Sequence, residues 1–92
     1  MNELIIRKIL DFFKCEYEKN GISPEASDKL NRFIGIASWS LKENTGLNDD
    51  LLNSGISWLK EKYLVESGGN INSYRLTMSG VEVAFDQNSL YE

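Results

Sequence analysis

The residue types that usually perform catalysis are scarce in this sequence. Histidine is absent, and the one cysteine, Cys15, has no histidine to activate its thiol. Ser57 and Lys60 have the spacing of a Ser-x-x-Lys nucleophile, but matches this short arise by chance and no partner motif follows. Asp49 and Asp50 are adjacent acids without further metal ligands spaced around them. The sequence therefore predicts no enzyme, no cofactor and no metal site, and it favours a binding function.

The composition is that of a small acidic globular protein. The chain has 92 residues, of which 41% are hydrophobic, so we expect one domain with one small core. Its formal net charge of −4 argues against a protein that coats nucleic acid by bulk electrostatics. The lone cysteine and the absence of a long apolar N-terminal run lead us to expect a cytoplasmic protein without membrane contact.

A helical pattern over residues 48–63 is the strongest structural signal. Leu52, Ile56, Leu59 and Tyr63 recur at spacings of four, three and four, which places them on one side of a helix that faces a core.

The residues before this helix predict a turn between two helices. Gly46 is the turn residue, and Leu47 fills the angle between the helices. Asn48 can cap the second helix by accepting from its free N–H groups. Asp49 and Asp50 are then favourably placed at the positive end of the helix dipole.

The first helix is expected over residues 2–19, because apolar residues recur at helical spacing and residues 20–21 are a stop signal. Its apolar arc spans roughly 160°, whereas a helix that serves one core needs little more than ~100°. One interpretation is a central helix covered on two sides by its own domain. The other is a homodimer or partner interface formed by Ile5, Ile9 and Phe12.

The segment that follows predicts a short edge strand and a long second helix. Gly21 and Ile22 are expected to form the strand, after which Ser23 caps a helix that runs to about residue 44. Gly35 interrupts this helix and predicts a bend or a break. Trp39 falls opposite the apolar stripe, so it is either buried or an exposed anchor for a partner, and burial is the favoured interpretation.

The last third of the chain predicts a hairpin and a helix. Residues 63–67 and 73–77 are expected as strands joined by a glycine-rich turn. Ser79 and Glu82 have the spacing of a capping box for a final helix. Its apolar face would be formed by Val81, Ala84 and Phe85, and residues 87–92 would be a short C-terminal tail.

The order of these signals resembles the winged helix-turn-helix superfamily, as found in small bacterial or phage-type regulators. Residues 46–48 precede the helix, and residues 74–80 match the Tyr-x-Leu-Thr-x-x-Gly signature that closes the wing in many such proteins. The resemblance implies one winged-helix domain over residues 1–86, mainly α with a small β-hairpin, in the order helix, short strand, helix, helix, strand, strand, helix. We expect a shared core formed by Leu10, Phe13, Ile34, Leu41, Leu52, Ile56, Leu59 and Leu76.

The same resemblance implies a transcription-regulator-like domain that binds double-stranded DNA. In that family the outward face of the third helix enters the major groove and the wing meets phosphates. The expected binding face is formed by Asn48, Asp49, Asp50, Asn53, Ser54, Ser57, Lys60 and Glu61. The expected wing residues are Asn70, Ile71, Asn72 and Arg75, and the further cations for phosphates are Arg7, Lys8, Lys29 and Arg32.

The charge distribution keeps a second function open. Residues 1–45 carry seven acidic and seven basic side chains, whereas residues 46–92 carry seven acidic and three basic ones. The whole negative excess thus lies in the half of the chain that should face DNA. The alternative is an acidic winged-helix module for protein–protein interaction, an adaptor or inhibitor, which does not bind DNA.

Overall fold

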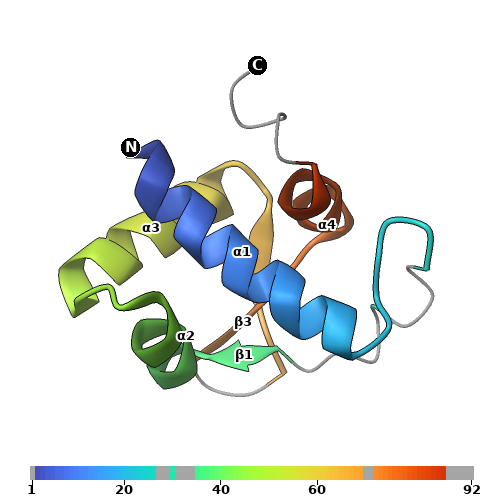
Figure 1. The fold of residues 1–92 in the computed structure, drawn as a ribbon. Helices are drawn as coiled ribbons and strands as arrows, with labels where there is room; N and C mark the ends of the chain where they lie inside the picture. Colours follow the sequence, from blue (N-terminus) through green and yellow to red (C-terminus); the bar gives the residue numbers. More distant parts are fainter. Residues whose placement is uncertain (1, 27–29, 31–34, 70–71, 87–92) are drawn as a thin grey trace.

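The computed structural model describes residues 2–26, 30, 35–69 and 72–86, and in these the chain is mainly helical with a small antiparallel sheet (Figure 1). Its elements follow in the order α1 (Glu3–Lys19), β1 (Ile36–Ala37), α2 (Ser38–Thr45), α3 (Asp49–Glu61), β2 (Val65–Ser67), β3 (Ser73–Leu76) and α4 (Met78–Phe85).

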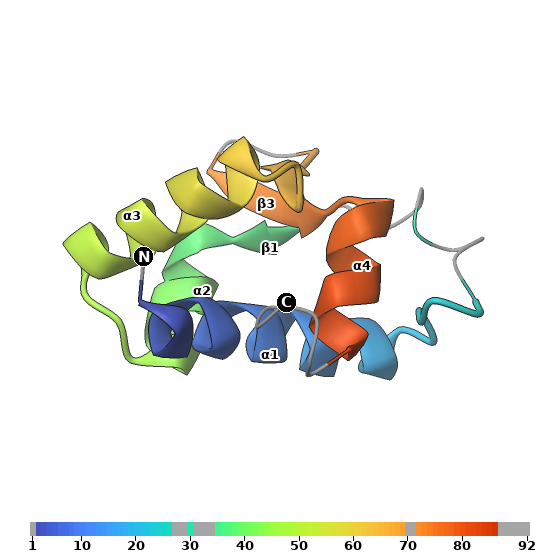
Figure 2. The ribbon, with the colours of Figure 1, turned by 90° about the horizontal axis from the view of Figure 1, so that it is seen from above.

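Helix α1 is the central helix, with α2 and α3 on one side and α4 on the other (Figures 1 and 2). It approaches α3 closely at Gly55, where a Cβ atom would lie 2.6 Å from Cδ1 of Ile9. Ile9 is fully buried, and Ile5 and Phe12 are half-buried against the core. The wide apolar arc of α1 is therefore largely covered by the chain itself, and Ile9 is not accessible to a second chain.

The predicted core is confirmed wherever the structure describes it. Ile34 lies outside the described residues. The other predicted members are buried in one cluster that joins all four helices and the sheet: Leu10, Phe13, Leu41, Leu52, Ile56, Leu59 and Leu76.

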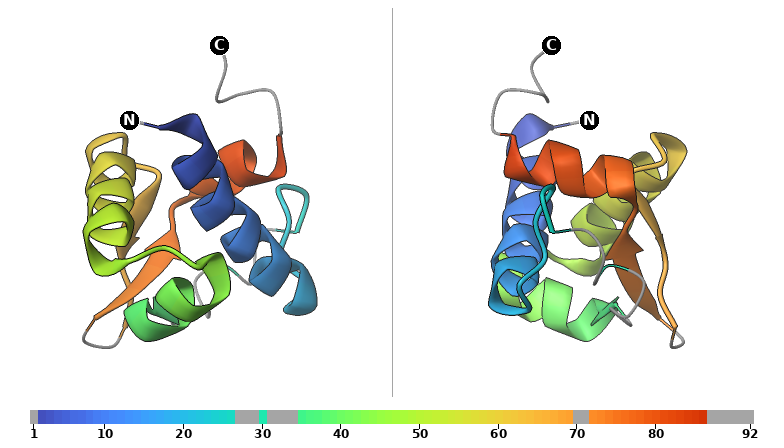
Figure 3. Two further views of the ribbon diagram at one scale, coloured as in Figure 1. Left: turned by 60° about the vertical axis from the view of Figure 1, so that its left-hand side comes forward. Right: turned by 90° about the vertical axis from the view of Figure 1, so that its right-hand side faces the viewer.

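The three strands pair in the order β1-β3-β2, all antiparallel. Val65 pairs with Leu76, and both are buried. Glu66 faces Arg75, and its Oε1 lies 3.0 Å from Nε of that arginine. Figure 3 shows the hairpin of β2 and β3 running toward the end of the molecule at which α2 lies. The hairpin expected from the sequence is thus present.

The prediction of an edge strand at Gly21 and Ile22 is wrong. Gly21 has a φ of +73°, and its N–H donates to the carbonyl of Glu18 while the Ile22 N–H donates to that of Tyr17. These two bonds form a Schellman motif, which ends α1 and satisfies its last carbonyls. The N–H groups of Gly21 and Ile22 therefore end α1 rather than pair with a strand. The side chain of Ile22 is buried.

The prediction of a single long second helix is also wrong. Ser23 and Ala26 exchange backbone hydrogen bonds across a tight turn, and residues 27–29 and 31–34 lie outside the described residues. Gly35 breaks the expected helix with a φ of +123°, and a Cβ there would lie only 3.0 Å from the carbonyl oxygen of Tyr74. This close approach lets residues 36–37 pair with β3, so the helix begins only at Ser38.

Tyr63 was expected in the core but is 80% exposed. Helix α3 ends at Glu61, and Tyr63 adopts a φ of +60° just beyond it. Its N–H donates to the Lys60 carbonyl, and the Leu64 N–H donates to the Leu59 carbonyl, which is again the Schellman arrangement. The helical spacing thus continues past the end of the helix, where the chain turns Tyr63 outward.

The last helix begins at a different cap from the one expected. Thr77, rather than Ser79, is the N-cap, and its hydroxyl oxygen accepts from the Gly80 N–H at 3.0 Å. The same hydroxyl donates to the Tyr63 carbonyl at 2.7 Å, which ties α4 to the end of α3. Val81 and Ala84 are buried as expected, and Phe85 packs against the core.

Tyr17 connects α1 to the sheet through a buried hydrogen bond. Its phenol oxygen accepts from the Leu76 N–H at 2.7 Å. Burial raises the pKa of Tyr17 from 10.0 to about 12. Because the folded pKa lies above the unfolded one, the stability gained from the neutral phenol is fully present below pH 10 and is lost as the pH rises toward 12.

We therefore expect Tyr17→Phe to lower the free energy of unfolding by about 1–3 kcal/mol at neutral pH, because it leaves the Leu76 N–H unsatisfied. The difference from the native chain should narrow between pH 10 and about 12, since only the native chain loses stability by ionising this phenol. Urea unfolding of both proteins across this range measures the difference. A difference that stays constant with pH would contradict the expectation.

Candidate functional site

The turn between α2 and α3 is built as the sequence predicts. Gly46 adopts a left-handed φ of +72°, which ends α2, and Leu47 is buried. The Asn48 side chain accepts from the Leu51 N–H at 2.9 Å and caps α3. Gly55 and Leu52 then hold α3 against the core, so its opposite side is fixed toward solvent.

The expected binding residues form one exposed strip, which we term the outer face of α3. The strip begins at the N-terminal cap and is polar along its whole length, with acids near both ends. All of its members are exposed: Asn48, Asp49, Asp50, Asn53, Ser54, Ser57, Lys60 and Glu61.

Two of the cations at this face are already engaged within the chain. Lys42 of α2 lies 3.1 Å from Oδ1 of Asp49. The ammonium of Lys60 lies 5.0 Å from the centre of the Tyr74 ring, in the geometry of a cation–π contact between α3 and β3. The acids Asp50 and Glu61 are therefore not offset by either of these two cations.

Arg75, the cation of the expected wing, is engaged by contacts within the chain. Arg75 is held between Glu66 and the Leu30 carbonyl oxygen, which accepts from Nη2 at 3.2 Å. The carbonyl of Asn72 accepts from the Ser38 N–H at 2.8 Å, which attaches the hairpin to the start of α2. Asn70 and Ile71, the other expected wing residues, lie outside the described residues.

Of the cations expected from the first two helices, Arg7 is already engaged within the chain. Arg7 faces α4, where its guanidinium donates to the Val83 and Ala84 carbonyls at 3.4 and 3.5 Å. It thereby stabilises the C-terminal end of that helix. Lys8 is exposed on α1, and residues 29 and 32 lie outside the described residues.

Trp39 is the largest difference between the expected and the observed site. Burial was the favoured interpretation, but the side chain is 69% exposed on α2. Because the helix begins at Ser38, only Leu41 of α2 is directed into the core and the indole projects from the first turn. Trp39 borders an open groove of about 480 Å³ lined also by Lys42, Glu43, Gly46, Leu47 and Asn48, which we term the turn groove.

Sequence reasoning did not identify the turn groove as a feature. Its two signals are a glycine in left-handed conformation and a tryptophan on the polar side of a short helix. Neither is distinctive until the start of α2 is known. The assignment of residues 35–37 therefore decides whether Trp39 belongs to the core or to the surface.

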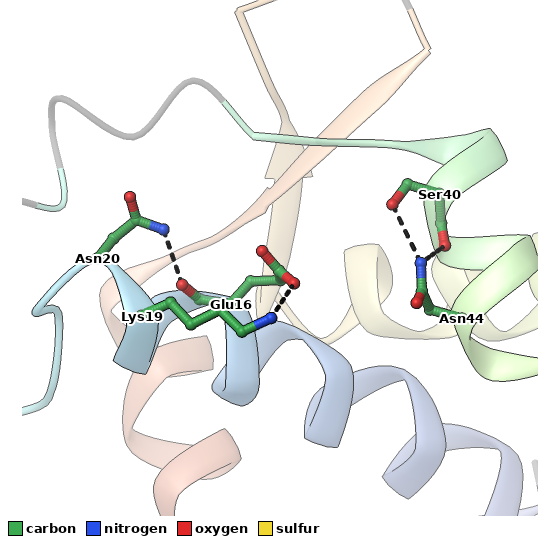
Figure 4. A network of polar contacts seen from close by, with 5 residues as sticks. All are labelled: Glu16, Lys19, Asn20, Ser40 and Asn44. Atoms are coloured by element: carbon green, nitrogen blue, oxygen red, sulfur yellow. Dashed lines mark hydrogen bonds and ion pairs between the residues drawn. The ribbon is translucent and has the colours of Figure 1, made fainter.

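Other polar side chains nearby are satisfied locally. Asn44 donates to the Ser40 carbonyl oxygen at 2.8 Å and to its hydroxyl oxygen at 3.3 Å (Figure 4). At the end of α1, Asn20 donates to the Glu16 carbonyl and Lys19 pairs with the Glu16 carboxylate (Figure 4). These contacts stay within single helix ends, so they fix helix geometry and do not form a ligand site.

Comparisons with known proteins do not assign this surface. The chain has no significant match among protein-family models, among curated proteins or among solved structures. Within residues 2–26, 30, 35–69 and 72–86, no group of three or more cysteine, aspartate or glutamate side chains could hold a metal ion. Among the helices in this part of the chain, none is long and apolar enough to span a membrane.

Proposed function

We propose that the chain is a non-catalytic winged helix-turn-helix domain whose α2–α3 surface binds a protein partner. The order of elements supports the winged-helix assignment, because a short strand between α1 and α2 pairs with the second strand of the hairpin. Thr77 and Gly80 of the wing-closing signature also have distinct structural roles, as cap and as close-packing residue.

The negative charge of the outer face of α3 is the main observation that favours a protein partner over DNA. A protein that binds nucleic acid gains most of its affinity by neutralising phosphates with cations. Here the face begins with Asp49 and Asp50, and Arg75 is engaged with Glu66 and Leu30. Bringing this face to a phosphate backbone would add repulsion, whereas a protein surface can supply complementary cations.

The exposed Trp39 supports the same choice. Tryptophan is enriched among the residues that dominate binding energy at protein interfaces, since it buries a large area and loses little rotamer entropy. It lines the turn groove together with Lys42 and Asn48, and the Lys42 ammonium lies 3.1 Å from Oδ1 of Asp49, the first residue of α3. One partner can therefore contact the apolar and the acidic parts together.

DNA binding is the second candidate, favoured by the polar strip in the middle of α3. Asn53, Ser54 and Ser57 are exposed side by side on a rigid helix, and such side chains can read base edges in the major groove. Under this alternative, binding by an isolated domain is weak, and affinity depends on a homodimer that places two surfaces on one duplex.

The DNA alternative makes a prediction of its own. Asp49→Asn with Asp50→Asn should raise affinity for mixed-sequence duplex DNA, because it removes two charges that face the phosphates. Fluorescence anisotropy with labelled duplex at low salt measures the change. If neither the native chain nor this variant binds duplex, the DNA alternative fails.

The homodimer expected from α1 remains a prediction. With Ile9 buried, the apolar residues available for it on α1 are Leu4, which is exposed, and the half-buried Ile5 and Phe12. This surface lies on a different helix from Trp39, so a dimer through α1 is compatible with a partner on α2 and α3.

The test of the proposed function compares the native chain with one variant and uses two kinds of ligand, peptides and duplex DNA. A random-peptide display library is selected against the native chain and against Ser54→Arg with Ser57→Arg, which adds bulk and charge to the outer face of α3. We expect peptides that bind the native chain and not this variant, and no binding of duplex DNA by the native chain at low salt. Duplex binding without any peptide enrichment would overturn the proposal.

A further inference from the structure

The turn groove differs from the rest of the α2–α3 surface in shape and polarity. It is open to solvent and mostly apolar, and its lining includes the buried Leu47 and the exposed Trp39. Its volume of about 480 Å³ falls within the range of ligand sites, ~300–1,000 Å³. An open shape of this size suits side chains that project from a larger molecule.

The charges around the groove are predominantly negative. Glu43 lines it, and Asp49 and Asp50 follow directly after Asn48, while Lys42 is the one basic residue of the lining. The three acids and one base give a local charge of −2. The N-terminal end of α3 offsets only about half an elementary charge, so the groove remains negative.

The ion pair of Lys42 with Asp49 is an exposed contact that a ligand can replace. Both side chains are about half or more exposed, and such pairs contribute little to stability in water. A guanidinium from a partner can donate two parallel hydrogen bonds to the same carboxylate, which an ammonium cannot do. Replacing the contact of Lys42 with Asp49 by a contact with the ligand therefore costs little free energy.

Charge also decides between possible occupants. A second copy of this chain would bring an equally acidic surface, and the whole chain carries a net charge of −4. Duplex DNA would bring phosphates to Glu43, Asp49 and Asp50. A basic protein segment is the occupant that gains from both the apolar groove and its acidic edge.

We infer that the turn groove binds a basic protein segment that inserts an apolar side chain beside Trp39 and places arginine or lysine against Glu43, Asp49 and Asp50. This inference rests on the proposed function and specifies its partner. The Trp39 indole forms the apolar wall of the site, and its exposed ring face makes a cation–π contact with arginine or lysine of the segment. The acids orient the segment and accelerate its association.

Two variants separate the contributions of the indole and the acids. Trp39→Ala should weaken binding of the selected peptides by at least about tenfold, as expected for a central interface tryptophan. Its matched control is Tyr63→Asn, which removes an even more exposed aromatic at the opposite end of α3, in a left-handed conformation that asparagine tolerates. Asp49→Asn with Asp50→Asn should weaken binding and reduce its salt dependence, whereas Glu18→Gln with Glu82→Gln, which changes the net charge equally, should not.

The experiment selects a random 12-residue peptide display library on the native 92-residue chain and measures the affinity of the enriched peptides by anisotropy. We expect peptides with arginine or lysine around an apolar centre, weakened by Trp39→Ala and by the Asp49 and Asp50 variant but not by the two controls. Thermal unfolding of each variant establishes that it is folded.

Three outcomes would overturn the inference. Neutral or acidic peptides that require the outer face of α3 would refute it and leave the protein-binding proposal standing. Basic peptides that bind Trp39→Ala as tightly as the native chain would refute the groove as their site. No enriched peptide, together with duplex binding at low salt, would refute both the inference and the proposed function.

Discussion

Gly80→Ala is expected to destabilise the protein by more than about 3 kcal/mol, a large part of the ~5–15 kcal/mol typical of a small domain. An alanine Cβ at this position would overlap the carbonyl oxygen of Leu64 and lie 2.9 Å from its carbonyl carbon. That carbonyl cannot move aside cheaply, because it accepts from the Thr77 N–H at 3.0 Å. Relief of the overlap therefore requires α4 to separate from the end of α3.

Urea unfolding monitored by circular dichroism measures this loss. The matched control is Ser79→Ala, one residue earlier on the same helix, where the side chain is exposed and the effect should stay within about 0.5 kcal/mol. Equal midpoints for Gly80→Ala and the native chain would contradict the close contact of α4 with Leu64.

Leu59→Ala is expected to cost roughly 2–5 kcal/mol, because it removes a fully buried side chain and leaves a cavity. Leu59 lies in the last turn of α3, where its carbonyl also accepts the hydrogen bond that closes the helix. The cavity would open in the core that α1, α3 and the sheet share.

The control for Leu59→Ala is Leu51→Ala, the same chemical change on the same helix at a side chain that is 40% exposed. Its effect should be much smaller, since a site open to water leaves no closed cavity. Thermal and urea unfolding of both variants give the comparison. Similar losses for the two leucines would show that the burial assigned to α3 is wrong.

The elements that could be predicted from the sequence are those determined by local signals. The stripe of Leu52, Ile56 and Leu59, the glycine turn and the Asn48 cap all lie within a few residues of one another, and each is present. Local spacing is sufficient there because both the helix and its cap depend on near neighbours in the chain.

In the region before α2, a bend or break at Gly35 was predicted, but the strand after it was not, because that strand depends on a distant pairing partner. Gly35 and residues 36–37 leave the helical pattern to pair with β3, almost forty residues later in the chain. The same cause explains Trp39: its exposure follows from where α2 begins, which the pairing with β3 decides. Tyr63 has a different explanation, since its spacing is helical but the helix has already ended.

The exposure and the negative charge of the candidate face could be predicted from the sequence, but the engagement of the wing cation could not. Asp49, Asp50 and Asn53 are exposed on the expected face of α3. The engagement of Arg75 by Glu66 and Leu30 requires the sheet register and the approach of Leu30, neither of which the spacing of residues reveals. This engagement removes the main cation of the wing and so changes the balance between DNA and protein as partner.

The most direct test of the proposed docking surface is an amide chemical-shift map. The ¹⁵N-labelled chain is titrated with the tightest-binding peptide from the display selection, and the chemical shift of each assigned amide is followed. The account predicts that the largest changes fall within residues 38–57, with the Trp39 indole N–H among them. Changes concentrated on the exposed side of α1 or on the hairpin, with α2 and the start of α3 unaffected, would contradict it.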